Sequence, residues 1–173
     1  MTIARIFTHA PFAALTVTIV STAALAGAYF FQYVVGLQPC MLCLYQRAPH
    51  ALEILMGLGA FVLARKGKVK HAAFILLLCA VVYFAEAIIA FYHAGVEQHW
   101  WVSFLEACTN PMMSTDPAAL LSAIEKAESV RCDAVPWSLL GISMAGYNAL
   151  LSLAMFAYTL IAALLITRRA NGL

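Results

Sequence analysis

Charged side chains are scarce in this sequence. Only 10% of its 173 residues are Asp, Glu, Lys or Arg, whereas a soluble domain has about 25%. The rest is strongly apolar, with 64% hydrophobic residues and a mean hydropathy of +0.89. A chain of this length cannot bury so much apolar surface in one water-soluble core. The composition therefore excludes an ordinary soluble enzyme and a disordered chain, and it predicts a small integral membrane protein.

A surplus of basic residues is also missing. Ten Lys and Arg residues stand against eight Asp and Glu residues, and the formal net charge is only +2. A nucleic-acid-binding domain usually carries a strongly basic patch or stripe. No nucleic-acid partner is therefore expected.

Four apolar runs are long enough to cross a bilayer as helices, which takes about 20 residues each. Backbone in contact with lipid must satisfy its own hydrogen bonds, and this favours helices for all four. We expect one membrane domain over residues 1–173, with spans at about 11–37, 48–64, 72–92 and 145–166. The first run is longer than the roughly 7–15 apolar residues of a cleavable signal peptide, so we interpret it as a retained helix.

The cations are distributed unevenly around these spans. Seven of the ten lie on one side of a four-span topology: Arg5, Arg65, Lys66, Lys68, Lys70, Arg168 and Arg169. The other three are Arg47, Lys126 and Arg131. Because cytoplasmic segments of membrane proteins are enriched in Lys and Arg, we expect both termini in the cytoplasm.

Four of the five cysteines fall on the opposite side of the predicted membrane. Cys40 and Cys43 follow the first span, and Cys108 and Cys132 lie in a long loop over about residues 93–141. Disulfides form and persist in oxidising compartments outside the cytoplasm. Two cysteine pairs are therefore expected where they can be oxidised. Cys79 lies within the third span and is expected to act as a small buried hydrophobe.

The long loop contains a candidate surface helix. Asp116 followed by Pro117 is typical of a helix start. Apolar residues then recur at helical spacing on one face: Leu120, Leu121, Ala123, Ile124, Ala127 and Val130. A short amphipathic helix of this kind would lie on the membrane surface. It would either cover the bundle or form a movable segment that carries Cys108 and Cys132.

The most informative motif is PCMLCLYQR, residues 39–47. Two cysteines in C-x-x-C spacing at a helix start often form a redox-active pair. The helix N-terminus and Arg47 both favour the thiolate, which is the attacking species. Leu44, rather than His, follows Cys43, and this excludes covalent haem attachment.

Two structural interpretations compete with redox chemistry. Structural zinc sites usually bring their cysteines in closely spaced pairs, whereas 23 residues separate Cys108 from Cys132, so no metal site is expected. A disulfide that only staples the fold could account for Cys108 and Cys132, because closing that loop is worth roughly 3 kcal/mol. A purely structural role leaves the C-x-x-C motif unexplained, because a disulfide that closes so short a loop adds little stability.

Three segments together resemble the disulfide bond formation protein B (DsbB) family of bacterial inner-membrane thiol oxidases. They are PCMLCLYQR, then YHAGVEQHWW at residues 92–101, and PWSLLGISMAGYN at residues 136–148. The resemblance covers essentially the whole chain. It implies a four-helix bundle that oxidises a periplasmic thioredoxin-like (DsbA-like) protein, supports periplasmic protein folding and reduces a membrane quinone, ubiquinone or menaquinone.

The resemblance also implies an electron path. The partner is expected to attack the Cys108–Cys132 disulfide at Cys108. Electrons then pass to the Cys40–Cys43 pair through exchange between Cys132 and Cys40, and Cys43 delivers them to the quinone. The cysteine pairs are accordingly expected on the periplasmic side of a multi-pass inner-membrane protein.

Further residues are candidates for the quinone pocket. Arg47 can stabilise the Cys43 thiolate and negative charge on a quinone oxygen, or it can simply anchor its helix to lipid phosphate. His93 and Met144 lie near the outer ends of their spans, where they either line the pocket or pack. Glu53 and Glu86 lie within spans, where a carboxylate is a functional candidate by default, although Glu53 can also pair with His50.

Two alternatives to the DsbB assignment stay open. An enzyme of the vitamin K epoxide reductase type uses similar C-x-x-C and quinone chemistry on four helices. The order of the cysteines here, with the C-x-x-C motif after the first span and the loop pair later, favours DsbB. The other alternative is a non-enzymatic membrane protein that is held together by disulfides or binds a metal.

Overall fold

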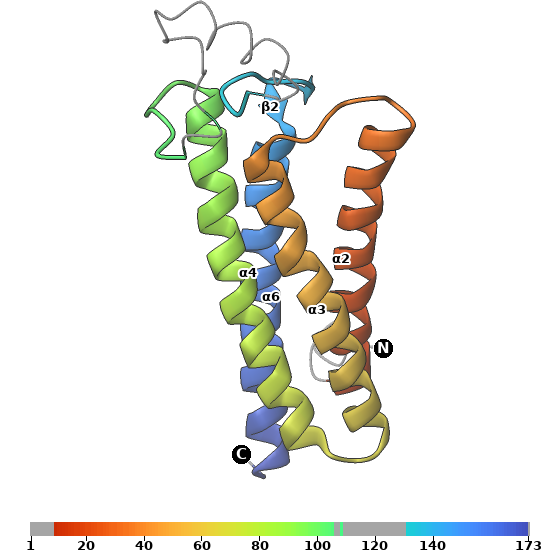
Figure 1. The fold of residues 1–173 in the computed structure, drawn as a ribbon. Coiled ribbons are helices and arrows are strands. Elements are labelled where there is room, and N and C mark those ends of the chain that lie inside the picture. The colour runs from red at the N-terminus through yellow and green to blue at the C-terminus, as the bar shows by residue number, and fades with distance from the viewer. Residues whose placement is uncertain (1–8, 106–107, 109–130, 173) are drawn as a thin grey trace, which may run out of the picture.

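The computed structural model describes residues 9–105, 108 and 131–172. Within these residues four long helices lie side by side (Figure 1): α2 (Ala10–Tyr33), α3 (Met41–Arg65), α4 (Val69–Glu97) and α6 (Met144–Ala170). Each is long and apolar enough to cross a membrane. The predicted all-α membrane fold is confirmed, while the predicted surface helix after Pro117 lies outside the described residues.

Small side chains occupy the contacts between the helices, and large ones face outward. Ala13, Ala60, Ala72 and Ala162 are fully buried. The large apolar side chains that are more than half exposed include Ile19, Leu55, Phe74, Val81 and Ile88. Helices in a bilayer pack through small residues because lipid is as apolar as leucine, so large apolar side chains gain nothing by moving inward. The bundle therefore presents the outer surface that lipid requires.

Several helix ends differ from the limits expected for the spans, and α6 continues to Ala170 rather than ending near residue 166. The helix α3 begins at Met41, well before residue 48, because Cys40 caps it by accepting a hydrogen bond from the Cys43 amide. The helix α2 ends at Tyr33, although the apolar run continues to Leu37, and Gly36 adopts a left-handed conformation with φ of +84°. The helix α4 continues to Glu97, so residues 93–97 are helical rather than part of the loop.

A short hairpin leads into the last helix. Strands β1 (Ser138–Leu139) and β2 (Ile142–Ser143) pair antiparallel. Leu140 and Gly141 between them both have positive φ angles, 53° and 78°, which is the two-residue turn that matches strand twist. The hairpin was not predicted from the sequence because leucine rarely adopts a positive φ. Ser143 then caps α6 by accepting a hydrogen bond from the Gly146 amide at 3.1 Å.

The two ends of the bundle differ in what they carry. At one end α2 begins, α3 connects to α4, and α6 ends (Figure 1). Arg65 and Lys66 lie at this end, together with Arg168 and Arg169 in the last turn of α6. The opposite end carries the α2–α3 connection and the hairpin (Figure 1), and with them Cys40 and Cys132.

Gly57 brings α2 and α3 into close contact, and this gives a test of the packing. A Cβ atom at Gly57 would lie 2.5 Å from Thr18 Oγ1 and 3.1 Å from the Ala14 carbonyl oxygen, whereas one at Gly59 would meet only Ile75 at 4.0 Å. We expect Gly57→Ala to lower the free energy of unfolding by about 1–3 kcal/mol through overpacking. Thermal unfolding in detergent would measure this, with Gly59→Ala as the matched control that keeps or gains stability. Equal unfolding temperatures for the two variants would contradict the close helix contact.

Candidate functional site

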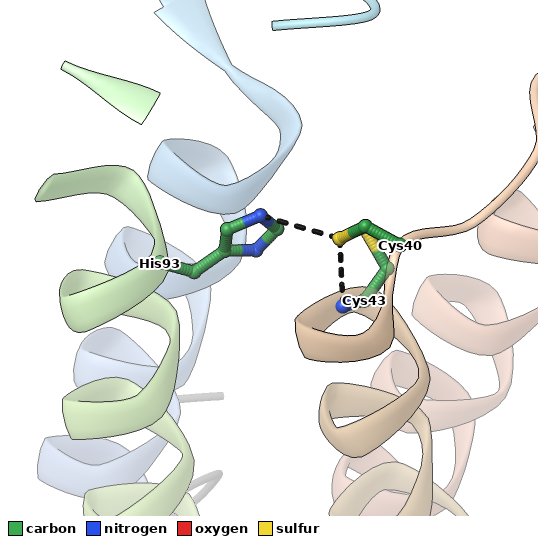
Figure 2. Close-up of side chains that lie close together, drawn as sticks. All are labelled: Cys40, Cys43 and His93. Atoms are coloured by element: carbon green, nitrogen blue, oxygen red, sulfur yellow. Dashed lines mark hydrogen bonds between the residues drawn. The ribbon is translucent and has the colours of Figure 1, made fainter. Parts of the chain in front are cut away.

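The two cysteines of the C-x-x-C motif lie together at the start of α3. Their Sγ atoms are 2.8 Å apart, and both are free thiols. The Cys43 amide donates to Cys40 Sγ at 3.2 Å, so the cap of the helix is itself a sulfur of the C-x-x-C pair (Figure 2). Cys43 sits in the first helical turn, where unpaired amide N–H groups favour negative charge on its sulfur.

The two thiols are not equivalent. Cys40 is buried, whereas Cys43 is half-buried. The hydrogen bond from Cys40 to Cys43, together with burial, raises the pKa of Cys40 well above the ordinary value for a thiol. Cys40 therefore keeps its proton while it donates to the Cys43 sulfur. This arrangement leaves Cys43 as the sulfur on which negative charge is held.

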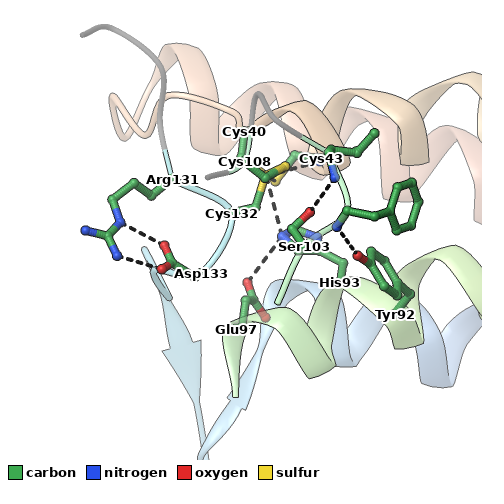
Figure 3. The surroundings of a disulfide bond; sticks show 12 residues. Cys40, Cys43, Tyr92, His93, Glu97, Ser103, Cys108, Arg131, Cys132 and Asp133 are labelled. Carbon is green, nitrogen blue, oxygen red and sulfur yellow. Dashed lines mark hydrogen bonds and ion pairs between the residues drawn. A yellow bond between two sulfur atoms is a disulfide. The ribbon is translucent and has the colours of Figure 1, made fainter. Parts of the chain in front are cut away.

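The second pair, Cys108 and Cys132, forms a disulfide directly beside the first. Both of its cysteines are buried and belong to one apolar cluster with Cys40, Leu42 and Val96. Figure 3 shows Cys40 and Cys43 next to this disulfide, although the two pairs lie far apart in the sequence. The four sequence-predicted cysteines are thus brought together at one end of the bundle.

A cavity of about 520 Å³ opens beside the C-x-x-C pair. All four residues expected to contact a quinone line it: Cys43, Arg47, His93 and Met144. Its other walls come mainly from α2 and α6, including Phe31 and Leu151. A small-molecule site is typically a mostly apolar cleft of about 300–1,000 Å³ with a few polar groups, and this cavity has that character.

Arg47 is held against α2 while part of its guanidinium stays without a partner. Its Nη1 donates to Gln32 Oε1 at 2.6 Å, and its Cζ lies 4.9 Å from the centre of the Tyr29 ring. Its Nε is buried and has no hydrogen-bond partner among the described residues. A buried donor usually has an acceptor, so a ligand oxygen in the cavity would fit this atom. The residues present therefore fit a quinone.

His93 contacts the C-x-x-C pair directly, through Cys40. Its Nε2 lies 3.4 Å from Cys40 Sγ (Figure 2) and 3.8 Å from Glu97 Oε1 (Figure 3). Its Nδ1 lies 2.8 Å from Gln46 Nε2, and Gln46 in turn accepts from Asn148 at 2.8 Å. Gln46 and Asn148 were not predicted from the sequence. Both lie in the segments that resemble the DsbB family, and Gln46 lies four residues before His50, thus on the same helix face.

The carboxylates within the spans form a second polar group deeper in the bundle. His50 lies between Glu53, at 3.2 Å, and Glu86, at 2.9 Å. The possible pairing of Glu53 with His50 is confirmed, and Glu86 joins the same cluster. Cys79 is fully buried in the apolar core, as expected.

Two groups of described residues have metal-ligand spacing. The ligand atoms of Cys40, Cys43 and His93 lie within 4.8 Å of one another, and so do those of His50, Glu53 and Glu86. The alternative of a zinc site made from all four outer cysteines does not agree with this structure, because Cys108 and Cys132 are joined as a disulfide and cannot act as thiolate ligands.

Comparison with known proteins agrees with the geometry of two cysteine pairs on a four-helix bundle. The family model for Disulfide bond formation protein DsbB matches residues 10–162. The chain belongs to the DsbB family. This DsbB-family protein is a multi-pass membrane oxidoreductase of disulfide bond formation, and the match sets aside the vitamin K epoxide reductase and non-enzymatic alternatives.

Curated relatives of this DsbB-family protein are similar along most of its length. Disulfide bond formation protein B of Polaromonas naphthalenivorans (strain CJ2) is 30% identical over 130 residues, covering 73% of this chain and 74% of the relative. The protein of the same name from Polaromonas sp. (strain JS666) is 27% identical over 159 residues, covering 90% and 89%. Uncharacterized protein RP370 of Rickettsia prowazekii (strain Madrid E) is 26% identical over 143 residues, covering 80% and 79%. No solved structure matches the chain.

The difference between the two thiols predicts the order in which they react. Because burial and the hydrogen bond to Cys43 raise the pKa of Cys40, Cys40 stays protonated at neutral pH and reacts slowly. We expect iodoacetamide to modify Cys43 before Cys40 when the reduced protein is treated at pH 7. Peptide mapping by mass spectrometry would measure both rates, with Cys79 as the buried internal control. Faster modification of Cys40 would reverse the assignment.

Proposed function

We propose that this protein oxidises a periplasmic thioredoxin-like dithiol protein and passes the electrons to a membrane quinone. The observation that carries the proposal is the position of both cysteine pairs in one buried cluster, beside a cavity that Cys43 and Arg47 line. Disulfide exchange needs a thiolate within reach of a disulfide sulfur, and the shared cluster meets this requirement. The cavity lies against the helices, where a lipid-soluble acceptor is available.

The exchange begins at the Cys108–Cys132 disulfide. A partner thiolate attacks Cys108 Sγ, forms a mixed disulfide and releases the Cys132 thiolate. Cys132 then attacks Cys40 of an oxidised Cys40–Cys43 pair and releases the Cys43 thiolate. The second partner thiolate resolves the first mixed disulfide, and the released Cys108 attacks Cys132, which frees Cys40.

These steps balance in bonds and electrons. The partner gains one disulfide, the Cys108–Cys132 bond is restored, and Cys40 and Cys43 are left as thiols. The structure, in which Cys108 and Cys132 form a disulfide while Cys40 and Cys43 are free thiols, has the bonding pattern of that state. A quinone bound in the cavity supplies an acceptor for two electrons and two protons, which returns Cys40 and Cys43 to a disulfide.

The roles of the cavity residues follow from their positions. Both cysteines of the pair line the cavity, and Cys43, the more exposed of the two, is assigned to face the acceptor. The unpaired Arg47 Nε can donate to a ligand oxygen and stabilise negative charge there and on Cys43. Met144 and His93 bound the cavity from α6 and α4.

The proposed orientation puts the cysteine end of the bundle in the periplasm of a bacterial inner membrane. The end with Arg65, Lys66, Arg168 and Arg169 would face the cytoplasm, as cation-rich segments usually do. The buried pairs would then lie where disulfides persist.

Replacing Cys43 tests the whole electron path. We expect Cys43→Ser to abolish quinone-dependent oxidation of a reduced thioredoxin-like partner, because the serine hydroxyl cannot form the second disulfide. The Cys108–Cys132 disulfide should still oxidise at most one equivalent of partner. Quinone absorbance and partner thiol counts would measure the two reactions, with Cys79→Ser as the control that keeps full turnover. Native quinone reduction by Cys43→Ser would disprove the path.

Replacing Arg47 separates the two half-reactions. We expect Arg47→Ala to slow quinone reduction by about 10²-fold, the effect of losing one preorganised donor to developing negative charge. Exchange between the partner and the Cys108–Cys132 disulfide should keep its native rate. Stopped-flow measurements of each half-reaction would test this, with Arg65→Ala at the opposite end of α3 as the control. An unchanged rate of quinone reduction would leave Arg47 as a lipid anchor only.

A further inference from the structure

A stripe of polar side chains runs along the buried face of α3. Gln46, His50 and Glu53 all lie on this face, and each is at most 7% exposed. Polar and ionisable residues inside membrane helices are costly and usually functional. The electron path described above uses none of the three. They contact α4 and α6 through a continuous set of hydrogen bonds, which we follow from the deepest group outward.

The deepest group is His50 between two carboxylates. Its Nδ1 lies 3.2 Å from Glu53 Oε2, and its Nε2 lies 2.9 Å from Glu86 Oε1. Both carboxylates are fully buried, and Ser21 Oγ also donates to Glu53 Oε2 at 2.8 Å. A histidine ring with a carboxylate at each nitrogen donates from both, which is the pattern of the charged imidazolium.

The cluster sets the direction of the Asn148 amide. Asn148 Nδ2 donates to Glu86 Oε1 at 3.1 Å and to Gln46 Oε1 at 2.8 Å. Its Oδ1 lies 3.1 Å from His50 Nε2 and accepts from it. The reverse orientation would place the amide oxygen against a carboxylate and the amide NH₂ group against a donor nitrogen. Only one orientation of Asn148 therefore satisfies its neighbours.

The orientation of Asn148 in turn determines which atom donates in each hydrogen bond between Asn148 and the thiols. Because Gln46 Oε1 accepts from Asn148, Gln46 Nε2 faces His93 Nδ1, at 2.8 Å, and donates to it. His93 Nδ1 must then be the unprotonated nitrogen, so the ring proton lies on Nε2, which faces Cys40 Sγ at 3.4 Å, Glu97 Oε1 at 3.8 Å and the backbone of Cys132. Cys40 in turn donates to Cys43 Sγ. Along this path each residue donates one hydrogen bond to the next, from His50 through Asn148, Gln46, His93 and Cys40 to Cys43.

We propose that His50, Glu53 and Glu86 form a positioning cluster which, through Asn148, Gln46 and His93, holds Cys40 as the donor and Cys43 as the thiolate. The chain of hydrogen bonds runs from a buried cation to a sulfur anion, and bonds in such a chain polarise one another. His93 is then a donor toward Cys40 and not a base that removes its proton. The inference rests on the proposed function only in taking Cys43 as the sulfur that reacts.

Other charged and titratable groups also face Cys43. Arg47 on α3 stabilises its negative charge, whereas Glu97 on α4 opposes it. Cys40 contacts Cys43 directly and His93 contacts Cys40, while Tyr147 on α6 and Arg131 line the same cavity. Tyr29 on α2 contacts Arg47. The variants below leave all of these groups in place, so a change in Cys43 reports on the chain.

The first test measures the reactivity of Cys43 without quinone. We expect Asn148→Leu, which breaks the chain between the cluster and Gln46, to slow the iodoacetamide modification of Cys43 at pH 7 about tenfold. This is equivalent to raising the pH of half-maximal rate by about one unit. Ser152→Ala is the matched control, because Ser152 lies one turn further along α6, is fully buried, and has no hydrogen-bond partner for its Oγ among the described residues. It should keep the native rate.

The second test reads the direction of the chain itself. In protein labelled with ¹⁵N-histidine, we expect His93 to carry its proton on Nε2 and His50 to carry protons on both nitrogens. Gln46→Glu keeps the shape of the side chain but accepts from both neighbours. It should therefore move the His93 proton to Nδ1, a change that packing alone does not produce. This variant also keeps the inference testable if Asn148→Leu fails to fold.

Three results would overturn the inference: a native rate of Cys43 modification in folded Asn148→Leu, a His93 proton on Nδ1 in the native protein, or a stoichiometric metal bound by His50, Glu53 and Glu86. Elemental analysis of the purified protein would detect the last. None of these measurements uses quinone or partner. A result that overturns the inference therefore does not by itself reject the proposed function. Native thiol reactivity with no quinone reduction would instead reject the proposed function alone.

Discussion

Polar groups inside a membrane bundle must find hydrogen-bond partners within the protein, because lipid offers none. This constraint explains why the interior of this protein is so strictly arranged. Glu53 and Glu86 are fully buried, and both contact His50. Ser21 and Tyr83 are joined at 2.7 Å on the far side of Glu53. Each of these contacts thereby fixes the orientation of a neighbouring side chain, whereas Ser152 Oγ has no partner among the described residues.

The same constraint determines how the helices approach one another. Hydrogen bonds between side chains of different helices require close backbones, and the alanines and Gly57 at the contacts permit this. Asn148 on α6 can reach both Gln46 on α3 and Glu86 on α4 only because the three helices meet there. Packing of small residues and satisfaction of polar groups are therefore two aspects of one arrangement.

The redox chemistry lies where the bundle reaches its end. The first turn of α3 supplies free amide groups that favour a thiolate, and the helix interior cannot supply these because its amides are already paired. Cys43 lies in that turn, and the disulfide of Cys108 and Cys132 lies against it. The cavity begins at the same level and continues between the helices. The thiol pair, the disulfide and the cavity thus lie together at this end of the bundle.

Features that depend on local pattern could be predicted from the chain alone. The four apolar runs determine the helices, because any lipid-exposed segment must pair its own backbone. The C-x-x-C spacing determines that Cys40 and Cys43 are close, since one helical turn joins them. Helix ends were harder to predict. Nothing in the apolar run to Leu37 shows that Gly36 turns the chain away, and Leu140 gives no sign of a hairpin.

Only the tertiary structure decided which distant residues meet. Gln46 reads as an ordinary polar residue until α4 places His93 beside it and α6 places Asn148 beside it. Glu86 reads as an isolated carboxylate until His50 is found 2.9 Å away. Such contacts depend on the rotation of each helix about its axis, which packing against three neighbours sets. Local sequence therefore determined the helices and the thiol pair, while the assembled bundle alone determined the polar chain that connects to them.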